Sequence, residues 1–192
     1  MSSRYDDELW SLVPEQRGPP PRHLEAFVRS LGPAAAVLDL GCGDGRLSGS
    51  LAAERLTLGD VSEVALARAS RSLPDAEAML VEPDAPLPLA DNVFDLVLCA
   101  EMLEHVRDAQ LLLSEVRRVL RPGGRLALTT PAHGRLTGLA VAVRGFERYF
   151  DPLNPHLRFL SRRSLARLLD SMGFRVQRLS REAGTLLAVA TR

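Results

Sequence analysis

Short apolar runs alternate along this chain with longer segments whose apolar residues recur at helical spacing. The apolar runs predict buried strands, and they lie at residues 37–40, 56–60, 78–81, 94–100 and 126–130. The helical spacing predicts helices at residues 22–31, 62–71, 108–120 and 161–172. Because strands and helices alternate, we expect parallel strands joined by right-handed crossovers.

Three segments lie outside this alternation. Residues 1–31 form an N-terminal helical lead, in which a short helix carrying Trp10 can pack over the mouth of a site. Residues 132–160 are long for a connection inside a compact domain, so we expect a substrate-side insert or lid there. Residues 174–179 and 185–190 predict two closing strands. No repeat is visible, and the length suits a single domain over residues 1–192.

A glycine turn directly after the first predicted strand carries the clearest chemical signal. Gly41, Gly43 and Gly45 stand at every second position. Glycine permits positive φ and lets the backbone approach a ligand closely. Leu47 and Leu51, four positions apart, predict that a short helix follows the turn. A strand, a glycine turn and a helix N-terminus together form a cradle for a nucleotide.

An acidic residue stands where such a cradle needs one. Asp60 closes the second predicted strand, about 20 positions after Gly41. A carboxylate there is placed to accept hydrogen bonds from ribose hydroxyls. The alternative reading makes the glycines an ordinary strand-to-helix turn and Asp60 a residue that starts the next helix.

Several motifs together resemble one known family. The run 37–45, Val-Leu-Asp-Leu-Gly-Cys-Gly-Asp-Gly, closely resembles the first motif of the class I S-adenosylmethionine (SAM)-dependent methyltransferases, of the methyltransferase type 11-like kind. NAD-binding turns usually place the third glycine one position later. The other matching motifs follow in the family's order between about residues 35 and 130, and they are Asp60, Asp84 before a proline-rich loop, Phe94-Asp95, Leu103-Glu104-His105-Val106 and Leu120-Arg121-Pro122-Gly123-Gly124-Arg125-Leu126.

This resemblance implies a fold, a cofactor and a reaction. The implied fold is an α/β, Rossmann-like doubly wound seven-stranded sheet, mostly parallel with a C-terminal antiparallel hairpin and with helices on both faces. The implied reaction transfers a methyl group from SAM to oxygen, nitrogen or carbon of a small or medium-sized acceptor. The implied cofactor-binding residues are Asp39, Gly41, Cys42, Gly43, Asp60, Val61, Asp84, Ala85, Ala100 and Glu101.

Two carboxylates in this set have specific implied roles. Asp39 is expected to pair with the methionine ammonium, directly or through water, although it can instead be a buried carboxylate bonded to the amides of the turn. Asp84 is expected to accept from the adenine amino group, and the Ala85 amide is expected to donate to the ring. The alternative for Asp84 is a turn residue beside prolines.

The patterns do not fix a catalytic base. Methyl transfer from SAM needs mainly in-line positioning, and it needs a base only if the acceptor must lose a proton. His105 is the catalytic candidate, because the resemblance places it near the donor methyl and its pKa range suits proton transfer. The other candidates are Glu101, Glu104, His133, Tyr149 and His156. The histidines have no ligand spacing along the chain, so no metal is expected.

The composition limits the classes of partner that we expect. The 24 basic and 24 acidic residues give a formal net charge of zero, which argues against nucleic acid as a partner. No apolar run reaches the length of a membrane span, and we expect a cytoplasmic protein with a small-molecule acceptor. Apolar residues of the insert suggest that this acceptor is partly apolar, although they can instead pack the insert onto the core; they are Leu136, Leu139, Val141, Phe146 and Phe150. The alternatives are a SAM-binding regulatory or non-catalytic protein and an NAD-type oxidoreductase, and the oligomeric state is not predicted.

Overall fold

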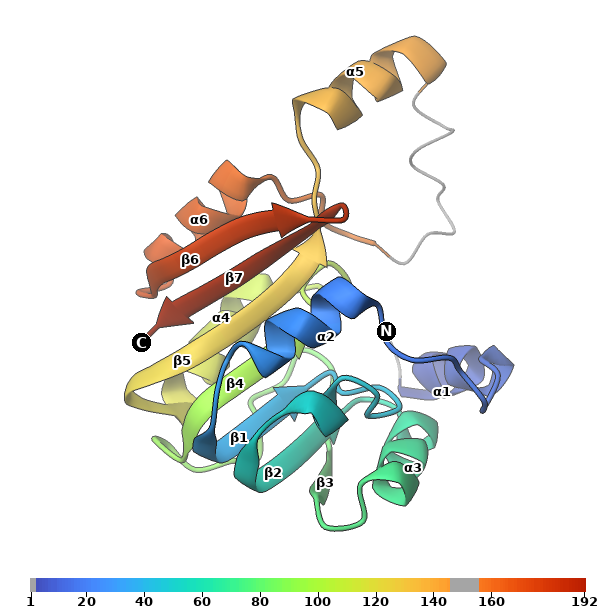
Figure 1. Cartoon of the computed structure of the whole chain (residues 1–192), viewed down its shortest axis with the longest axis vertical. Coiled ribbons are helices and arrows are strands. Elements are labelled where there is room, and N and C mark those ends of the chain that lie inside the picture. Colours follow the sequence, from blue (N-terminus) through green and yellow to red (C-terminus); the bar gives the residue numbers. More distant parts are fainter. Residues whose placement is uncertain (1–2, 146–155) are drawn as a thin grey trace.

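The computed structural model of the chain describes residues 3–145 and 156–192 (Figure 1). The elements in chain order are α1 (Ser3–Leu12), α2 (Arg22–Arg29), β1 (Ala34–Leu40), the 3-10 turn η1 (Ser48–Ser50), β2 (Ala53–Asp60), α3 (Glu63–Ser72), β3 (Glu77–Leu80), β4 (Phe94–Ala100), α4 (Ala109–Val119), β5 (Leu120–Pro131), α5 (Arg135–Arg144), α6 (Arg162–Ser171), β6 (Arg175–Glu182) and β7 (Thr185–Thr191). Of the residues singled out in the sequence, Phe146, Tyr149 and Phe150 lie outside the described residues.

The strands form one seven-stranded sheet in the order β3-β2-β1-β4-β5-β7-β6. The pairs from β3 to β5 are parallel, and β7 pairs antiparallel with both β5 and β6. The predicted sheet, with its C-terminal antiparallel hairpin, is therefore confirmed. The strand order reverses between β1 and β4, and in open α/β sheets the crevice outside the carboxyl ends at such a point binds ligands.

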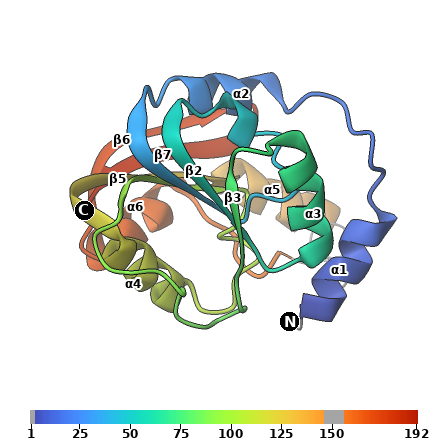
Figure 2. The ribbon, with the colours of Figure 1, turned by 90° about the horizontal axis from the view of Figure 1, so that it is seen from below.

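Helices cover both faces of the sheet, because successive residues of a strand point to opposite sides. In β4, Val97 and Cys99 belong to one apolar cluster, which α4 and α6 cover, whereas Leu96 and Leu98 belong to the cluster that α2 covers. A third cluster joins Leu58 of β2 to α3. Seen from below, α2 lies on one side of the sheet and α4 lies on the other (Figure 2). The prediction that helices cover both faces of the sheet is confirmed.

Three helices have an N-cap side chain that accepts hydrogen bonds from amides of the first turn. The hydroxyl of Ser62 accepts from the Ala65 amide at 3.1 Å, and Asp108 accepts from the amides of Gln110 and Leu111. The hydroxyl of Ser161 accepts from the Ser164 amide at 3.2 Å. Each cap satisfies amides that the helix itself leaves without partners.

Two details of the prediction are wrong. The glycine turn is not followed by a helix of useful length, because only the 3-10 turn Ser48–Ser50 fits before β2 begins at Ala53. Leu47 and Leu51 still pack against the α2 cluster, which explains their spacing. The fifth strand begins at Leu120 rather than near Leu126, since Leu120 already pairs with Phe94 of β4.

The insert leaves the sheet after β5. Helix α5 lies beyond the carboxyl end of β5, apart from the body of the sheet (Figure 1). The chain returns at an isolated bridge between Ala132 and Leu160. Among the described residues, no helix has both the length and the apolar character that crossing a membrane requires.

Candidate functional site

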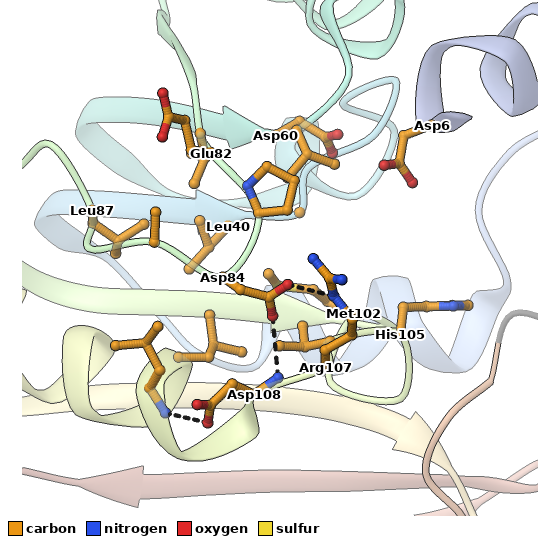
Figure 3. A pocket seen from close by; sticks show the side chains of 18 of the residues that line it. Asp6, Leu40, Asp60, Glu82, Asp84, Leu87, Met102, His105, Arg107 and Asp108 are labelled. Carbon is orange, nitrogen blue, oxygen red and sulfur yellow. Dashed lines mark hydrogen bonds and ion pairs between the residues drawn. The ribbon is translucent and has the colours of Figure 1, made fainter. Parts of the chain in front are cut away.

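A cavity of about 340 Å³ opens at the carboxyl ends of β1, β2 and β4, where the strand order reverses. This volume lies in the usual range for small-molecule sites. Of the predicted residues, those that line the cavity are Gly41, Gly43, Asp60, Val61, Asp84, Ala85, Glu101 and His105. Figure 3 shows Asp60 and Glu82 on one side of the cavity and Met102, His105 and Arg107 on the other.

Asp60 holds the glycine loop in place at the cavity wall. Gly41 and Gly43 have φ of 76° and 56°, a backbone conformation that residues with a side chain rarely adopt. The Gly43 amide donates to the Asp60 carboxylate at 2.8 Å, and the Ser62 amide donates to its other oxygen at 3.0 Å. Burial raises the pKa of Asp60, and these amide hydrogen bonds oppose the rise. Asp60 thus fixes the loop while it borders the cavity.

Three predicted residues do not line the cavity. Asp39 lies beneath the loop with 2% of its surface exposed, and its carboxylate accepts from the Ser48 hydroxyl at 2.6 Å. Burial raises the pKa of Asp39 to about 7. Cys42 packs its side chain with Leu58 in the α3 cluster, and Ala100 packs against the α2 cluster. Burial raises the pKa of the Cys42 thiol as well, so this thiol stays protonated.

Asp84 stands at the centre of the cavity wall with φ of 53° (Figure 3). One of its oxygens accepts from Arg107 Nε at 2.7 Å, and the other accepts from the Asp108 amide at 3.1 Å. Burial raises the pKa of Asp84, but these hydrogen bonds outweigh burial and hold the pKa below its ordinary value. A carboxylate accepts about four hydrogen bonds, so the ionised Asp84 can still receive one from a ligand.

The loop that carries Asp84 is braced from α4 by an ion pair that the sequence analysis did not identify. Glu115 accepts from the Leu87 amide at 2.8 Å and from Arg118 at 2.7 Å. Arg118 donates in turn to the carbonyls of Leu87 and Leu89. The only sequence signal for this brace is an acidic and a basic residue three positions apart on the predicted helix.

Helix α1, in the N-terminal lead, borders the cavity with Trp10 in the cavity lining. A Cβ atom at Gly43 would lie 2.8 Å from the Trp10 ring, so the ring rests directly on the glycine loop. Asp7 accepts from the Ser62 hydroxyl at 2.6 Å, which ties α1 to the start of α3. Asp6 and Leu9 line the cavity beside Trp10. Asp6 and Asp7 were missed because a polar lead gives no periodic signal.

The far end of the cavity is formed by the chain that follows β4. Glu101 has φ of 51°, and its carboxylate accepts from the Thr129 hydroxyl at 2.8 Å. Glu104 is 1% exposed and accepts from the Thr130 hydroxyl at 3.0 Å. Burial raises the pKa of Glu104 to about 7, and the nearby Glu101 charge adds to this rise. His105 lies beside His156, with 4.8 Å between the ring centroids.

Comparisons with known proteins identify the family. Residues 38–128 match the model of a family described as a methyltransferase domain. The chain is 39% identical over 165 residues to a malonyl-[acyl-carrier protein] O-methyltransferase of Methylococcus capsulatus, with 81% of this chain and 58% of that protein covered. It is 31% identical over 144 residues to a ubiquinone biosynthesis O-methyltransferase of Idiomarina loihiensis, with 70% and 59% covered.

A solved structure agrees on the fold. A putative methyltransferase from Bacillus halodurans superposes with a TM-score of 0.73 at 17% identity, with 89% of this chain and 99% of that chain covered. Residues 38–128 of the chain thus match the SAM-dependent methyltransferase family, and SAM is the cofactor that this family implies. The chain spans 58%, 32% and 52% of the length of the first three curated relatives that it matches.

The lining of the cavity fits this cofactor. Asp60 and Asp84 offer carboxylates to hydrogen-bond donors such as ribose hydroxyls and an adenine amino group. The positive-φ glycines bring backbone to the cavity wall with no side chain between. The family assignment also counts against the NAD-type oxidoreductase that the sequence analysis kept as an alternative.

Proposed function

We propose that this protein transfers a methyl group from SAM to an oxygen atom of a small or medium-sized, partly apolar acceptor. The observation that carries this proposal is the cavity where the strand order reverses, bordered by the glycine loop, Asp60 and Asp84 in a chain of the methyltransferase family. Bound SAM supplies an electrophilic methyl group on a sulfonium centre. The chain's own residues hold this group in line with the acceptor and exclude water.

Each part of the cavity has a proposed task in holding the cofactor. The backbone at Gly41, Cys42 and Gly43 borders the methionine end, and Asp39 compensates the ammonium charge from beneath the loop. Asp60 and Val61 hold the ribose. Asp84 and Ala85 hold the adenine, while α1 shields the cavity through Trp10.

The acceptor side is proposed to lie beyond Ala100 and Glu101, at the ends of β4 and β5. His105 lines the cavity there and is the proposed catalytic residue, acting on the proton of an acceptor hydroxyl. Oxygen is the proposed acceptor atom because two relatives are named O-methyltransferases. Leu157 and Phe159, which are 51% and 41% exposed beside this region, support a partly apolar acceptor.

The proposal extends to partners and location. The net charge of zero supports a small-molecule acceptor rather than a nucleic acid. The proposed location is the cytoplasm.

A labelled-methyl assay tests this function. The chain is incubated with SAM that carries a tritiated methyl group and with two matched panels, alkyl-substituted phenols and carboxylic acids in one and the corresponding amines in the other. We expect labelled ethers or esters from the oxygen panel. Labelled amines without labelled oxygen products would refute the choice of acceptor atom.

A pair of variants links this activity to the cavity. Ala85→Leu places a larger side chain in the cavity wall, whereas Ala78→Leu adds the same side chain to an exposed position of β3. We expect the affinity for SAM to fall at least about tenfold in Ala85→Leu, a loss of about 1.4 kcal/mol, and to stay unchanged in Ala78→Leu. Equal affinities in both variants would place the cofactor elsewhere.

A further inference from the structure

Side chains of metal-ligand type meet at the acceptor end of the cavity, although they are far apart in the sequence. Glu104, His105 and His156 each offer one ligand atom, and these atoms all lie within 4.8 Å of one another. Two of the residues follow β4, and the third lies near the end of the insert, before α6. The sequence predicts no metal because it shows no ligand spacing, but here the tertiary structure supplies the spacing.

The main chain holds the two parts of this cluster together. The Leu157 amide donates to the Glu104 carbonyl at 2.7 Å, which fixes the segment directly after His156 against the turn that carries Glu104 and His105. Arg158 donates to the carbonyl of Arg107, adding a second link between the same two segments. The juxtaposition therefore rests on backbone contacts and not on the side chains alone.

The Glu104 carboxylate can accept a cation in addition to its hydrogen bond. The Thr130 hydroxyl donates to one oxygen of Glu104, and a carboxylate has about four acceptor sites. Glu104 is 1% exposed, and a buried carboxylate without a compensating charge is costly. Ligand atoms around a tetrahedral zinc ion lie about 3.3 Å apart, from metal–ligand distances of about 2.0 Å. Small side-chain rotations therefore suffice to close the cluster around an ion.

His133 lies beside the segment that carries His156. His133 follows β5, and its ring centroid lies 5.0 Å from that of Phe159, three positions after His156. Among the described residues, neither ring nitrogen of His133 has a hydrogen-bond partner, although both are buried. Buried polar atoms in native proteins are almost always paired with protein, water or an ion.

We propose that Glu104, His105 and His156 form a binding site for one first-row divalent cation, such as Zn²⁺, at the acceptor end of the cavity. Two imidazoles and one carboxylate are a ligand set of catalytic zinc sites, which keep a further position open. Mg²⁺ and Ca²⁺ fit less well, because they prefer all-oxygen ligands. His105 then acts on the acceptor hydroxyl as a ligand of this cation.

The ligand for the open position is an oxygen atom of the acceptor, and the cation lowers the pKa of a hydroxyl bound there. This role in acceptor activation rests on the proposed function, whereas the binding of the cation does not. Metal binding and SAM binding are therefore measured separately on the same preparation.

Calorimetry on the untagged, chelator-treated chain tests the site with Zn²⁺ alone as the probe. We expect one ion per chain, and with Co²⁺ in place of Zn²⁺ we expect the visible absorption of a tetrahedral site. Glu104→Gln, His105→Ala and His156→Ala should each weaken the affinity at least about 100-fold, because even changes behind the ligands cost about 10- to 100-fold. His23→Ala is the matched control and should keep the affinity, since His23 contacts Thr185 and lies outside the cluster.

Thermal unfolding of each variant without metal shows whether it is folded. The absence of saturable one-to-one binding to the folded chain would overturn the proposal. Binding that is equal in the three ligand variants and in His23→Ala would overturn it as well, since the ion would then lie elsewhere. If the ion binds and SAM does not, the metal site stands and the methyltransferase proposal fails.

Discussion

Replacing Asp39 by asparagine should make the protein more stable at neutral and alkaline pH. Asp39 is 2% exposed, and burial raises the pKa of its carboxyl to about 7 from an ordinary value of 3.8. Its carboxyl group accepts a hydrogen bond from the Ser48 hydroxyl at 2.6 Å. The asparagine carbonyl can accept the same hydrogen bond with no charge to bury.

The sign of the effect follows from proton uptake. Between pH 3.8 and about 7, the folded chain keeps this proton while the unfolded chain has lost it. Stability from this group is therefore complete below pH 3.8 and is lost as the pH rises through about 7. A pKa difference of about three units, at about 1.4 kcal/mol each, amounts to about 4 kcal/mol at pH 8.

The assay is urea unfolding of both proteins between pH 5 and pH 8. The free energy of unfolding of Asp39→Asn should exceed that of the unchanged chain by an amount that grows with pH toward about 4 kcal/mol. Asp95→Asn is the control with the opposite sign. Burial raises the pKa of Asp95, but hydrogen bonds from the Ala36 amide and Arg121 outweigh burial and lower it, so this variant should lose stability above pH 4. A pH-independent difference for Asp39→Asn would refute the reasoning.

Two further predictions concern the loop and the cap beside the cavity. Ser62→Ala removes the cap of α3 and the link to Asp7, so it should lower the free energy of unfolding by about 1 to 2 kcal/mol. The control Ser72→Ala, at the exposed end of the helix, should change this free energy by less than about 0.5 kcal/mol. Equal losses in the two variants would contradict the capping role of Ser62. Gly41→Ala puts a side chain at φ 76° and 2.9 Å from Met102, so it should cost at least about 1 kcal/mol in urea unfolding. Gly18→Ala meets no atom within 4 Å and should be neutral, and a neutral Gly41→Ala would show that the loop tolerates side chains.

The sheet could be predicted from the sequence because its determinants are local. The run from Leu96 to Ala100 is apolar on both faces of the strand, and Ser62, Asp108 and Ser161 are cap residues directly before helical patterns. The cofactor side of the site followed from ordered motifs whose residues stand at strand ends. These residues reach one cavity once the parallel strands are in register.

The parts that could not be predicted depend on contacts between distant segments. The short helix expected after Gly45 is absent because β2 begins at Ala53, a limit that hydrophobic spacing does not show. The Asp7 link to Ser62 and the meeting of His156 with Glu104 join residues separated by about 50 positions or more in the chain. No periodicity encodes such contacts, so the lead and the acceptor end needed the structure.

Calorimetric titration of SAM into the purified chain, with NAD as the control ligand, tests the central claim most directly. The proposed function predicts one SAM per chain at micromolar affinity and no binding of NAD. It also predicts that Asp60→Asn, checked for folding by thermal unfolding, weakens SAM binding by about 1 to 3 kcal/mol, as expected for a lost charged hydrogen bond. A folded chain that binds no SAM would contradict the account and leave the glycine loop and Asp60 as parts of the architecture alone.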